Sequence, residues 1–373
     1  MYLNGNVKFI FSKVGPKLKG SLRVIHLMTN INKKVEKIFN SATRSPQVHD
    51  AVLLVENTKG DFSASFSYGG KDADMLINSA SIGKMYTAAI ILILWEQKRL
   101  TLDDLLGKYF EKPVLDGLHI YKGAEYSHKL TIADLLFQTS GLPDYTEEGG
   151  TKMDLAKSDF MLSFADGLSR TKKLKPHFAP GTAHKVYYSD FNFDLLGEII
   201  KNITNTPLPK TYKEFLFDPL GLTKTYLPAS EQNIIPNIRY KGESLYRPKA
   251  ILSCSASGGI VTTAREMMLF LKAFWNGTFF SKNMFEKIAV YRKLPFSNKK
   301  GPIWYGGGYM QIPLRTLLTL YSGKGELIGH SGATSCGAFY YPYKDLFFVC
   351  DFNQVANPAI PIKLTMRLAM SVK

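Results

Sequence analysis

The sequence predicts an α/β protein in which both ends of the chain build one α/β unit and the middle forms a mainly helical insertion. Two observations favour this class. Strand-like alternation occurs near the start of the chain and returns after about residue 303, and apolar residues at helical spacing dominate the part between. The composition agrees, because 45% hydrophobic and 21% charged residues are typical of a globular protein with a sizeable core.

The N-terminal part of the chain predicts one helix and two strands. Residues 30–39 carry apolar side chains at helical spacing behind a polar cap. The runs at residues 51–56 and 62–68 are typical of strands, and Lys59-Gly60 between them is a turn signal. We expect these three elements to belong to the α/β unit.

Residues 1–27 differ in composition from the sequence that follows. They contain five basic residues, no acidic residue and no apolar segment followed by a cleavage site. We expect either a loosely held basic extension or a functional start at Met28. A protein that begins at Met28 should therefore keep its full activity and melting temperature.

The remaining chain divides into a helical middle and a strand-rich end. Helical spacing predicts helices at residues 82–97, 102–109, 131–137, 191–203, 212–217 and 263–275. The later pattern predicts strands at residues 305–311, 315–321, 327–330, 337–341 and 346–351, and a last helix at 360–370. We expect a discontinuous α/β domain of residues 28–76 and 251–373, and a mainly helical domain of residues 77–250.

Charge, apolar runs and cysteine usage narrow the classes of partner and compartment. The net charge of +16 is spread along the chain without a nucleic-acid recognition motif, so we expect a solvated basic surface and no nucleic acid. The longest apolar run, Ala88 to Trp95, is far shorter than the roughly 20 residues of a membrane span. Three scattered cysteines fit a cytoplasmic location, with association at the cell surface left open.

The positions of the histidines argue against two kinds of catalytic site. Gly329-His-Ser-Gly-Ala333 looks like the nucleophile elbow of an α/β-hydrolase, but that fold needs a histidine after the serine, and none follows Ser331. The chain has no HExxH motif and no two histidines three or four residues apart, so we expect no metal. No cofactor is expected either.

A serine activated by a lysine fits better. Ser81-Ile-Gly-Lys84 places both side chains on one helix face, at the start of a strongly apolar segment. Burial would lower the pKa of Lys84 and make it a usable base, and a helix start favours a developing oxyanion. The copies at Ser169–Lys172 and Ser297–Lys300 lie in lysine-rich polar stretches, where a lysine would be hydrated.

Three motifs in this order, Ser81-Ile-Gly-Lys84, Tyr188-Ser-Asp190 and His330-Ser-Gly332, resemble the serine β-lactamase and penicillin-binding-protein superfamily, in its AmpC-like and carboxylesterase-containing branch. The resemblance covers about residues 30–370, with supporting stretches at 135–143, 257–266 and 305–309. It implies a β-lactamase/transpeptidase-like fold: an antiparallel sheet flanked by terminal helices, a helical domain, and an active site at their interface.

The resemblance also implies an acyl-enzyme mechanism. Ser81 would attack a carbonyl, Lys84 and Tyr188 would share the removal and return of its proton, and water would release the acyl group. The oxyanion would lie between the backbone N–H groups of Ser81 and Ala333. The implied substrate-binding and oxyanion positions are Asp190, His330, Gly332 and Ala333.

Three positions depart from the family pattern. Asp190 stands where many relatives have asparagine, and facing Lys84 it would favour the ammonium and leave Tyr188 as proton acceptor. His330 replaces the lysine with which penicillin-recognising relatives hold a substrate carboxylate. Gln138 stands where relatives often have histidine, in a segment interpreted as structural. We therefore expect neutral short-chain esters to be hydrolysed better than penicillins.

The sequence thus predicts a serine hydrolase acting on a small ester, amide or D-amino-acid peptide. Two alternatives stay open: a dedicated D-alanyl-D-alanine carboxypeptidase or β-lactamase, and a non-catalytic sensor that a β-lactam acylates. The oligomeric state cannot be predicted from the sequence.

Overall fold

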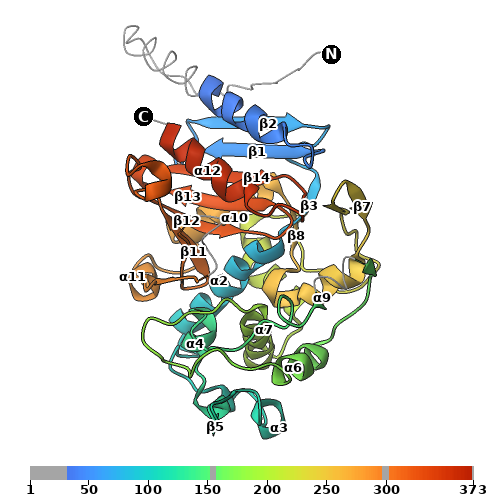
Figure 1. Cartoon of the computed structure of the whole chain (residues 1–373), viewed down its shortest axis with the longest axis vertical. Coiled ribbons are helices and arrows are strands. Elements are labelled where there is room, and N and C mark those ends of the chain that lie inside the picture. The colour runs from blue at the N-terminus through green and yellow to red at the C-terminus, as the bar shows by residue number, and fades with distance from the viewer. Residues whose placement is uncertain (1–31, 152–156, 296–301, 372–373) are drawn as a thin grey trace.

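The computed structural model describes residues 32–151, 157–295 and 302–371. Its central element is an antiparallel sheet of eight strands, which occupies the upper half of the molecule in Figure 1. In spatial order the strands are β2 (Ser63–Tyr68), β1 (Ala51–Glu56), β14 (Leu346–Asp351), β13 (Cys336–Tyr341), β12 (Glu326–Ser331), β11 (Tyr309–Pro313), β10 (Trp304–Gly306) and β9 (Arg292–Lys293).

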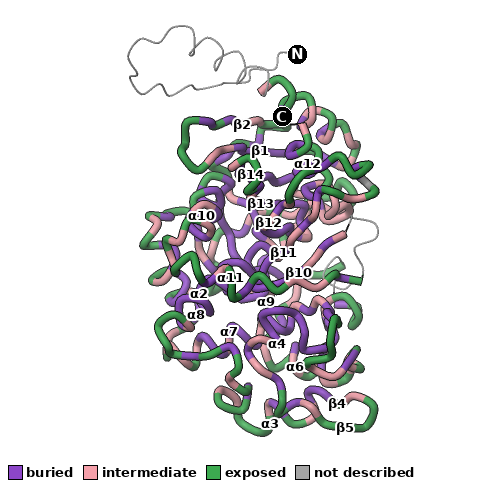
Figure 2. Tube along the Cα trace, turned by 90° about the vertical axis from the view of Figure 1, so that its left-hand side faces the viewer, coloured by how far each residue is buried: buried purple, intermediate pink, exposed green. Residues whose placement is uncertain are grey.

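Both ends of the chain contribute to this sheet. Strand β1 pairs with β14, so that Leu53 lies opposite Cys350, and the next strand, β2, forms the edge. Two helices, α10 (Ala264–Asn276) and α12 (Ile360–Ser371), cover opposite faces of the sheet (Figure 2). A further helix spans residues 32–43. The predicted fold class is therefore confirmed.

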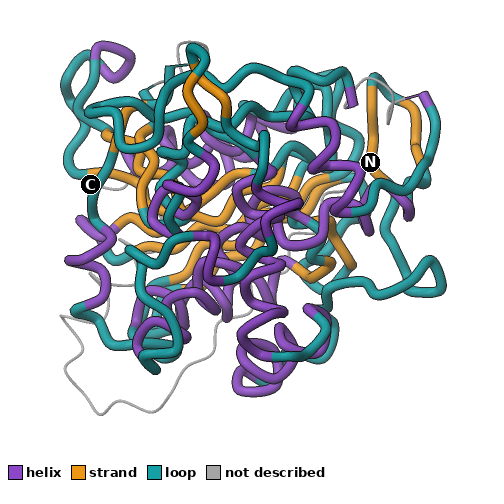
Figure 3. The backbone as a smooth tube through the Cα atoms, turned by 90° about the horizontal axis from the view of Figure 1, so that it is seen from below, coloured by secondary structure: helices purple, strands orange, loops and turns teal. Residues whose placement is uncertain are grey.

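The lower half of the molecule is mainly helical, and seen from below its helices lie in front of the strands (Figure 3). Its longer helices are α2 (Gly83–Glu96), α6 (Phe164–Lys172), α7 (Asp190–Thr204) and α9 (Pro248–Gly258). The short helices of the chain are α3 (Lys112–Leu115), α4 (Ile132–Leu136), α8 (Leu208–Tyr212) and α11 (Met284–Ile288). The described residues also form three two-stranded antiparallel sheets: β3 (Leu76–Asn78) with β8 (Val261–Thr263), β4 (Ile120–Tyr121) with β5 (Ala124–Glu125), and β6 (Ile238–Tyr240) with β7 (Glu243–Leu245).

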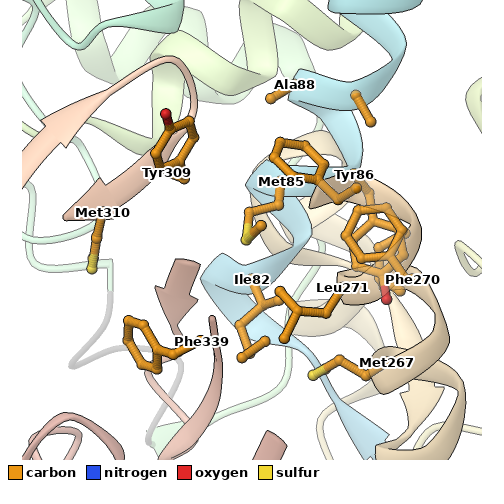
Figure 4. Close-up of a cluster of buried hydrophobic side chains, with 14 of the residues drawn as sticks. Ile82, Met85, Tyr86, Ala88, Met267, Phe270, Leu271, Tyr309, Met310 and Phe339 are labelled. Atoms are coloured by element: carbon orange, nitrogen blue, oxygen red, sulfur yellow. The ribbon is translucent and has the colours of Figure 1, made fainter. Parts of the chain in front are cut away.

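Helix α2 connects the two halves. Every residue from Gly83 to Leu94 is buried, because the helix packs against α7 and α9 on one side and meets the sheet and α10 on the other. At that contact Tyr86 stacks on Phe270 of α10 with ring centroids 3.5 Å apart (Figure 4). A helix that is apolar all round must be buried in this way.

Some predicted elements are wrong. Residues 315–321 form no strand, because Thr316 caps a short 3₁₀ turn, Leu317–Thr319, and Leu320 follows with φ 48°. Of the helix predicted at 102–109, only the 3₁₀ turn Leu106–Lys108 is helical. The single strand predicted at 305–311 is the hairpin of β10 and β11, turned by two glycines with positive φ, Gly307 and Gly308.

No helix among the described residues is long and apolar enough to cross a membrane. The extension of residues 1–27 and the start at Met28 lie outside the described residues. The boundaries proposed near residues 76 and 250 stay a prediction.

Candidate active site

Ser81 lies at the junction of the two halves. It belongs to a 3₁₀ turn, Ala80–Ile82, that follows β3 and leads directly into α2. The preceding Ala80 has φ 44°, a left-handed conformation that turns the chain sharply before the serine. Ser81 borders a cavity of about 540 Å³, to which Tyr188, Ser331 and Ala333 also contribute.

The structure brings Lys84 to Ser81 and surrounds its ammonium with acceptors. The buried Lys84 Nζ donates to Asp190 Oδ1 at 2.5 Å, to the Ser257 carbonyl at 2.7 Å and to Ser81 Oγ at 3.4 Å. An ammonium has three N–H donors, so each of them has an acceptor here. This arrangement suits the charged form of Lys84.

The pKa of Lys84 confirms this preference. Burial lowers the pKa of Lys84, but the charge and the hydrogen bond of Asp190 raise it, and the net direction is upward. The motif predicts that burial lowers the pKa of Lys84. This prediction is wrong, because Asp190 more than offsets the desolvation. Lys84 stays an ammonium at neutral pH.

A break in α9 aims the Ser257 carbonyl at Lys84. Ser255 has φ 32° and ψ −121°, so the helix is interrupted just before its end. The last residue of α9, Gly258, lies against Gly83 at the start of α2, where an added Cβ on Gly83 would be 3.0 Å from the Gly258 Cα. Only two glycines allow the two helix ends to meet this closely.

Tyr188 completes the group around Ser81. Its ring lies 5.0 Å from Lys84 Nζ, measured to the ring centroid, and packs edge-on against Tyr305. The pKa of Tyr188 is well above its usual value, because burial and the charge of Asp190 disfavour the phenolate. No hydrogen bond of the described residues engages its buried hydroxyl. The resting form is a neutral phenol.

Gln138 fixes the segment that carries Tyr188. Its side chain accepts from Ser189 N at 2.9 Å and donates to the Ser189 carbonyl at 3.1 Å, and its own carbonyl accepts from Tyr187 N at 3.0 Å. The buried amide thus holds the residues on both sides of Tyr188. This agrees with the structural role expected for Gln138.

The end of β12 forms the opposite wall of the cavity. Gly332 approaches so closely that an added Cβ would lie 2.6 Å from the Ser79 carbonyl, two residues before Ser81. The next residue, Ala333, lines the cavity, and none of the backbone–backbone hydrogen bonds of the described residues uses its N–H. The oxyanion role of this N–H stays a prediction.

Two predicted substrate contacts lie behind the cavity wall. His330 is fully buried, its Nδ1 donates to the Ser331 carbonyl at 2.8 Å, and its ring packs near those of Tyr188 and Tyr305. Asp190 is engaged by Lys84. Neither residue is among the described residues that line the cavity, and their contacts are with Lys84 for Asp190 and with the Tyr188 ring for His330.

The acidic residues of the cavity were missed by sequence reasoning: Asp144, Glu147 and Glu148. They directly follow Ser140-Gly-Leu-Pro143, so their position next to a family-like stretch was the available signal. In the described part of the chain no group of three or more His, Cys, Asp or Glu side chains could hold a metal ion.

Curated proteins with similar sequences cover part of this chain. The D-alanyl-D-alanine-carboxypeptidase/endopeptidase AmpH of Escherichia coli (strain K12) is 26% identical over 232 residues, 61% of this chain and 57% of AmpH. Protein flp of Staphylococcus aureus (strain COL) is 29% identical over 187 residues, 47% of this chain and 34% of flp. The chain therefore matches little more than half of AmpH and a third of flp.

Solved structures with the same fold cover most of this chain. The D-amino acid amidase from Ochrobactrum anthropi SV3 has a TM-score of 0.72 at 18% identity, over 91% of this chain and 98% of that one. EstCE1, a hydrolase with promiscuous acyltransferase activity, has a TM-score of 0.72 at 17% identity, over 92% and 99% of the two chains. The Beta-lactamase family model matches residues 51–369. Because this match spans most of the chain, the chain belongs to the Beta-lactamase family.

Proposed function

We propose that this protein is a serine hydrolase that works through an acyl-enzyme on a small ester, amide or D-amino-acid peptide. The observation that carries the proposal is the position of Ser81, which borders a cavity that Tyr188 also lines, while its Oγ lies 3.4 Å from the Lys84 ammonium. The names of the relatives, a carboxypeptidase/endopeptidase, an amidase and a hydrolase, support it.

In the acylation step Ser81 Oγ forms a bond to the substrate carbonyl carbon, and the bond from that carbon to the leaving oxygen or nitrogen breaks. Its proton passes to the Tyr188 oxygen while Tyr188 gives its own proton to the leaving oxygen or nitrogen, so no phenolate accumulates. The Lys84 ammonium stabilises the negative charge that develops on the oxygens nearby, and the backbone N–H groups of Ser81 and Ala333 hold the oxyanion. Water then attacks the acyl carbon, and the Ser81 oxygen leaves with a proton returned through Tyr188.

The test compares Ser81→Ala with Ser331→Ala, a second serine in the same cavity. Turnover of p-nitrophenyl acetate should be abolished in Ser81→Ala and persist in Ser331→Ala. Intact-mass spectrometry should detect the acyl adduct on wild type and not on Ser81→Ala. The opposite pattern would make Ser331 the nucleophile and overturn the proposal. Both variants should fold, because the loss of one hydroxyl costs about 1–2 kcal/mol at most.

The runner-up is a D-alanyl-D-alanine carboxypeptidase, favoured by the match to AmpH. A D-Ala-D-Ala peptide and a chromogenic cephalosporin, assayed beside the ester, separate this activity and a β-lactamase from an esterase. A sensor would show the cephalosporin adduct by mass without turnover of any of the three compounds.

A further inference from the structure

The cavity beside Ser81 has an acidic wall. Asp144, Glu147 and Glu148 border it, and among its described lining residues there is no lysine, arginine or histidine. The cationic group near the nucleophile, Lys84, is engaged by Asp190. Charges inside a cavity with low-dielectric walls act strongly on a bound ligand. The sign of the charge on this wall therefore affects which substrates bind.

Glu148 is an oriented carboxylate. Its Oε1 accepts from Asp144 N and Tyr187 Oη, both at 2.8 Å, and pairs with His177 Nε2 at 3.0 Å. Burial raises the pKa of Glu148, but these hydrogen bonds lower it, and the net direction is downward. Glu148 is therefore ionised, and three groups fix its orientation.

Asp144 is a buried carboxylate with one oxygen available. Only 2% of the residue is exposed, yet it lines the cavity. Its Oδ1 accepts from Thr146 N at 2.9 Å, and no hydrogen bond or ion pair of the described residues engages Oδ2. Burial and the charge of Asp190 raise the pKa of Asp144 well above its usual value. The resting group therefore favours its neutral form, and a cation from a ligand at Oδ2 would favour the carboxylate.

We propose that the cavity selects substrates that carry an ammonium group, held by Asp144, Glu147 and Glu148 while the ester or amide carbonyl lies at Ser81. Apolar side chains such as Ile303 and Met310 form another part of the wall and fit an apolar body. The favoured substrate class is therefore an amino-bearing ester, amide or peptide. This inference rests on the proposed serine hydrolase.

The test uses three p-nitrophenyl esters whose acyl chains have equal length and end in an ammonium, a methyl or a carboxylate group. Wild-type kcat/KM should be highest for the ammonium ester, roughly tenfold above the methyl ester, and lowest for the carboxylate ester. Added salt should reduce the ammonium preference, because it screens the charges. Equal values, or a preference for the carboxylate ester, would overturn the inference.

Variants locate the preference. Asp144→Asn and Glu147→Gln should each lower the ratio of kcat/KM for the ammonium ester to that for the methyl ester by about threefold or more. Glu243→Gln removes an exposed carboxylate on β7 that does not line the cavity, and it should keep the wild-type ratio. If this ratio is unchanged in both cavity variants, the acidic wall is not the source of the ammonium preference.

Two failures can be told apart. If Ser81→Ala hydrolyses the methyl ester as well as wild type does, the proposed function is wrong. If hydrolysis of the methyl ester depends on Ser81 but the three esters react alike, only the ammonium site is wrong.

Discussion

Asp190 decides the protonation state of the residue next to the nucleophile. Its carboxylate lies 2.5 Å from Lys84 Nζ and keeps the pKa of Lys84 above its usual value in spite of complete burial. An asparagine at this position would remove the largest contribution that opposes burial and leave the smaller one of Asp144. One substitution therefore separates two roles for Lys84, an ammonium that stabilises charge and a neutral amine that accepts a proton.

We expect Asp190→Asn to lower the pKa of Lys84 and thereby to shift the alkaline limb of the kcat/KM profile down by about 1–3 pH units. The direction of this shift follows from the role of Lys84. If the ammonium is needed, activity is lost at the pH where Lys84 loses its proton, and in the variant this pH is lower. The profile is measured with p-nitrophenyl acetate between pH 6 and 10, where wild type should show no limb from Lys84, because its pKa lies above the usual lysine value, and the variant should show one. Higher activity of the variant at pH 7 would instead show that neutral Lys84 is the base.

Local spacing could identify some of these residues and not others. Ser81 and Lys84 are three residues apart on one helix, so the sequence alone predicts that they meet. The acceptor at Ser257 is a backbone carbonyl, which no side-chain pattern encodes. The direction in which the pKa of Lys84 shifts depends on a contact with Asp190, 106 residues away, and such a balance is fixed only by tertiary packing.

At the scale of elements, the contact between α2 and α9 holds the site together. Gly83→Ala would bring a methyl group to about 3.0 Å from the Gly258 Cα, closer than carbon atoms normally pack. The helix ends must then separate, which moves the Ser257 carbonyl away from Lys84. We expect Gly83→Ala to lower stability by about 1–3 kcal/mol and kcat/KM by more than tenfold.

The matched control is Gly107→Ala. Gly107 also lies in a helical turn, but an added Cβ there would meet nothing nearer than Leu115 Cδ1 at 4.0 Å. Its melting temperature and kcat/KM should stay close to wild type. Equal effects of the two substitutions would show that the helix contact does not position the site.

Elements with a plain pattern were predicted well. Strands β1 and β14 begin and end at the predicted residues, because each is a short apolar run bounded by turn residues. Helix α9 was missed, since serines and glycines dilute its apolar spacing and Ser255 interrupts it. The turn at residues 317–319 was predicted as a strand because its leucines suggest alternation, whereas Thr316 and Thr319 exchange cap contacts that stabilise a 3₁₀ turn.

At the scale of the whole molecule, buried charges tie distant segments together. Lys71, which follows β2, lies between Asp50 before β1 and Asp351 at the end of β14. Burial lowers the pKa of Lys71, but the two carboxylates raise it and keep the lysine charged. This cluster joins the two ends of the chain at the sheet. The strand pattern predicts that both ends contribute to the same unit, but it does not predict these ion pairs.

Asp194 is a buried carboxyl group that no salt bridge of the described residues engages. It lies one turn after Asp190 on α7, its Oδ1 has no hydrogen-bond partner among the described residues, and Tyr145 Oη donates to Oδ2 at 3.3 Å. Burial and the charge of Asp190 raise the pKa of Asp194 from 3.8 to about 7. Since the folded state holds this proton more tightly than the unfolded state, the contribution to stability is complete below pH 4 and is lost as the pH rises through 7.

This loss amounts to about 4 kcal/mol at 1.4 kcal/mol per pH unit, and Asp194→Asn should avoid it because the amide cannot ionise. The difference in melting temperature between Asp194→Asn and wild type should therefore grow in favour of the variant from pH 4.5 to 7.5, by several degrees, and level off above that range. Asp103→Asn, which changes an exposed carboxylate, should show a difference that does not vary with pH. A pH-independent difference for Asp194→Asn as well would mean that the buried carboxyl ionises in the folded protein as easily as it does in the unfolded chain.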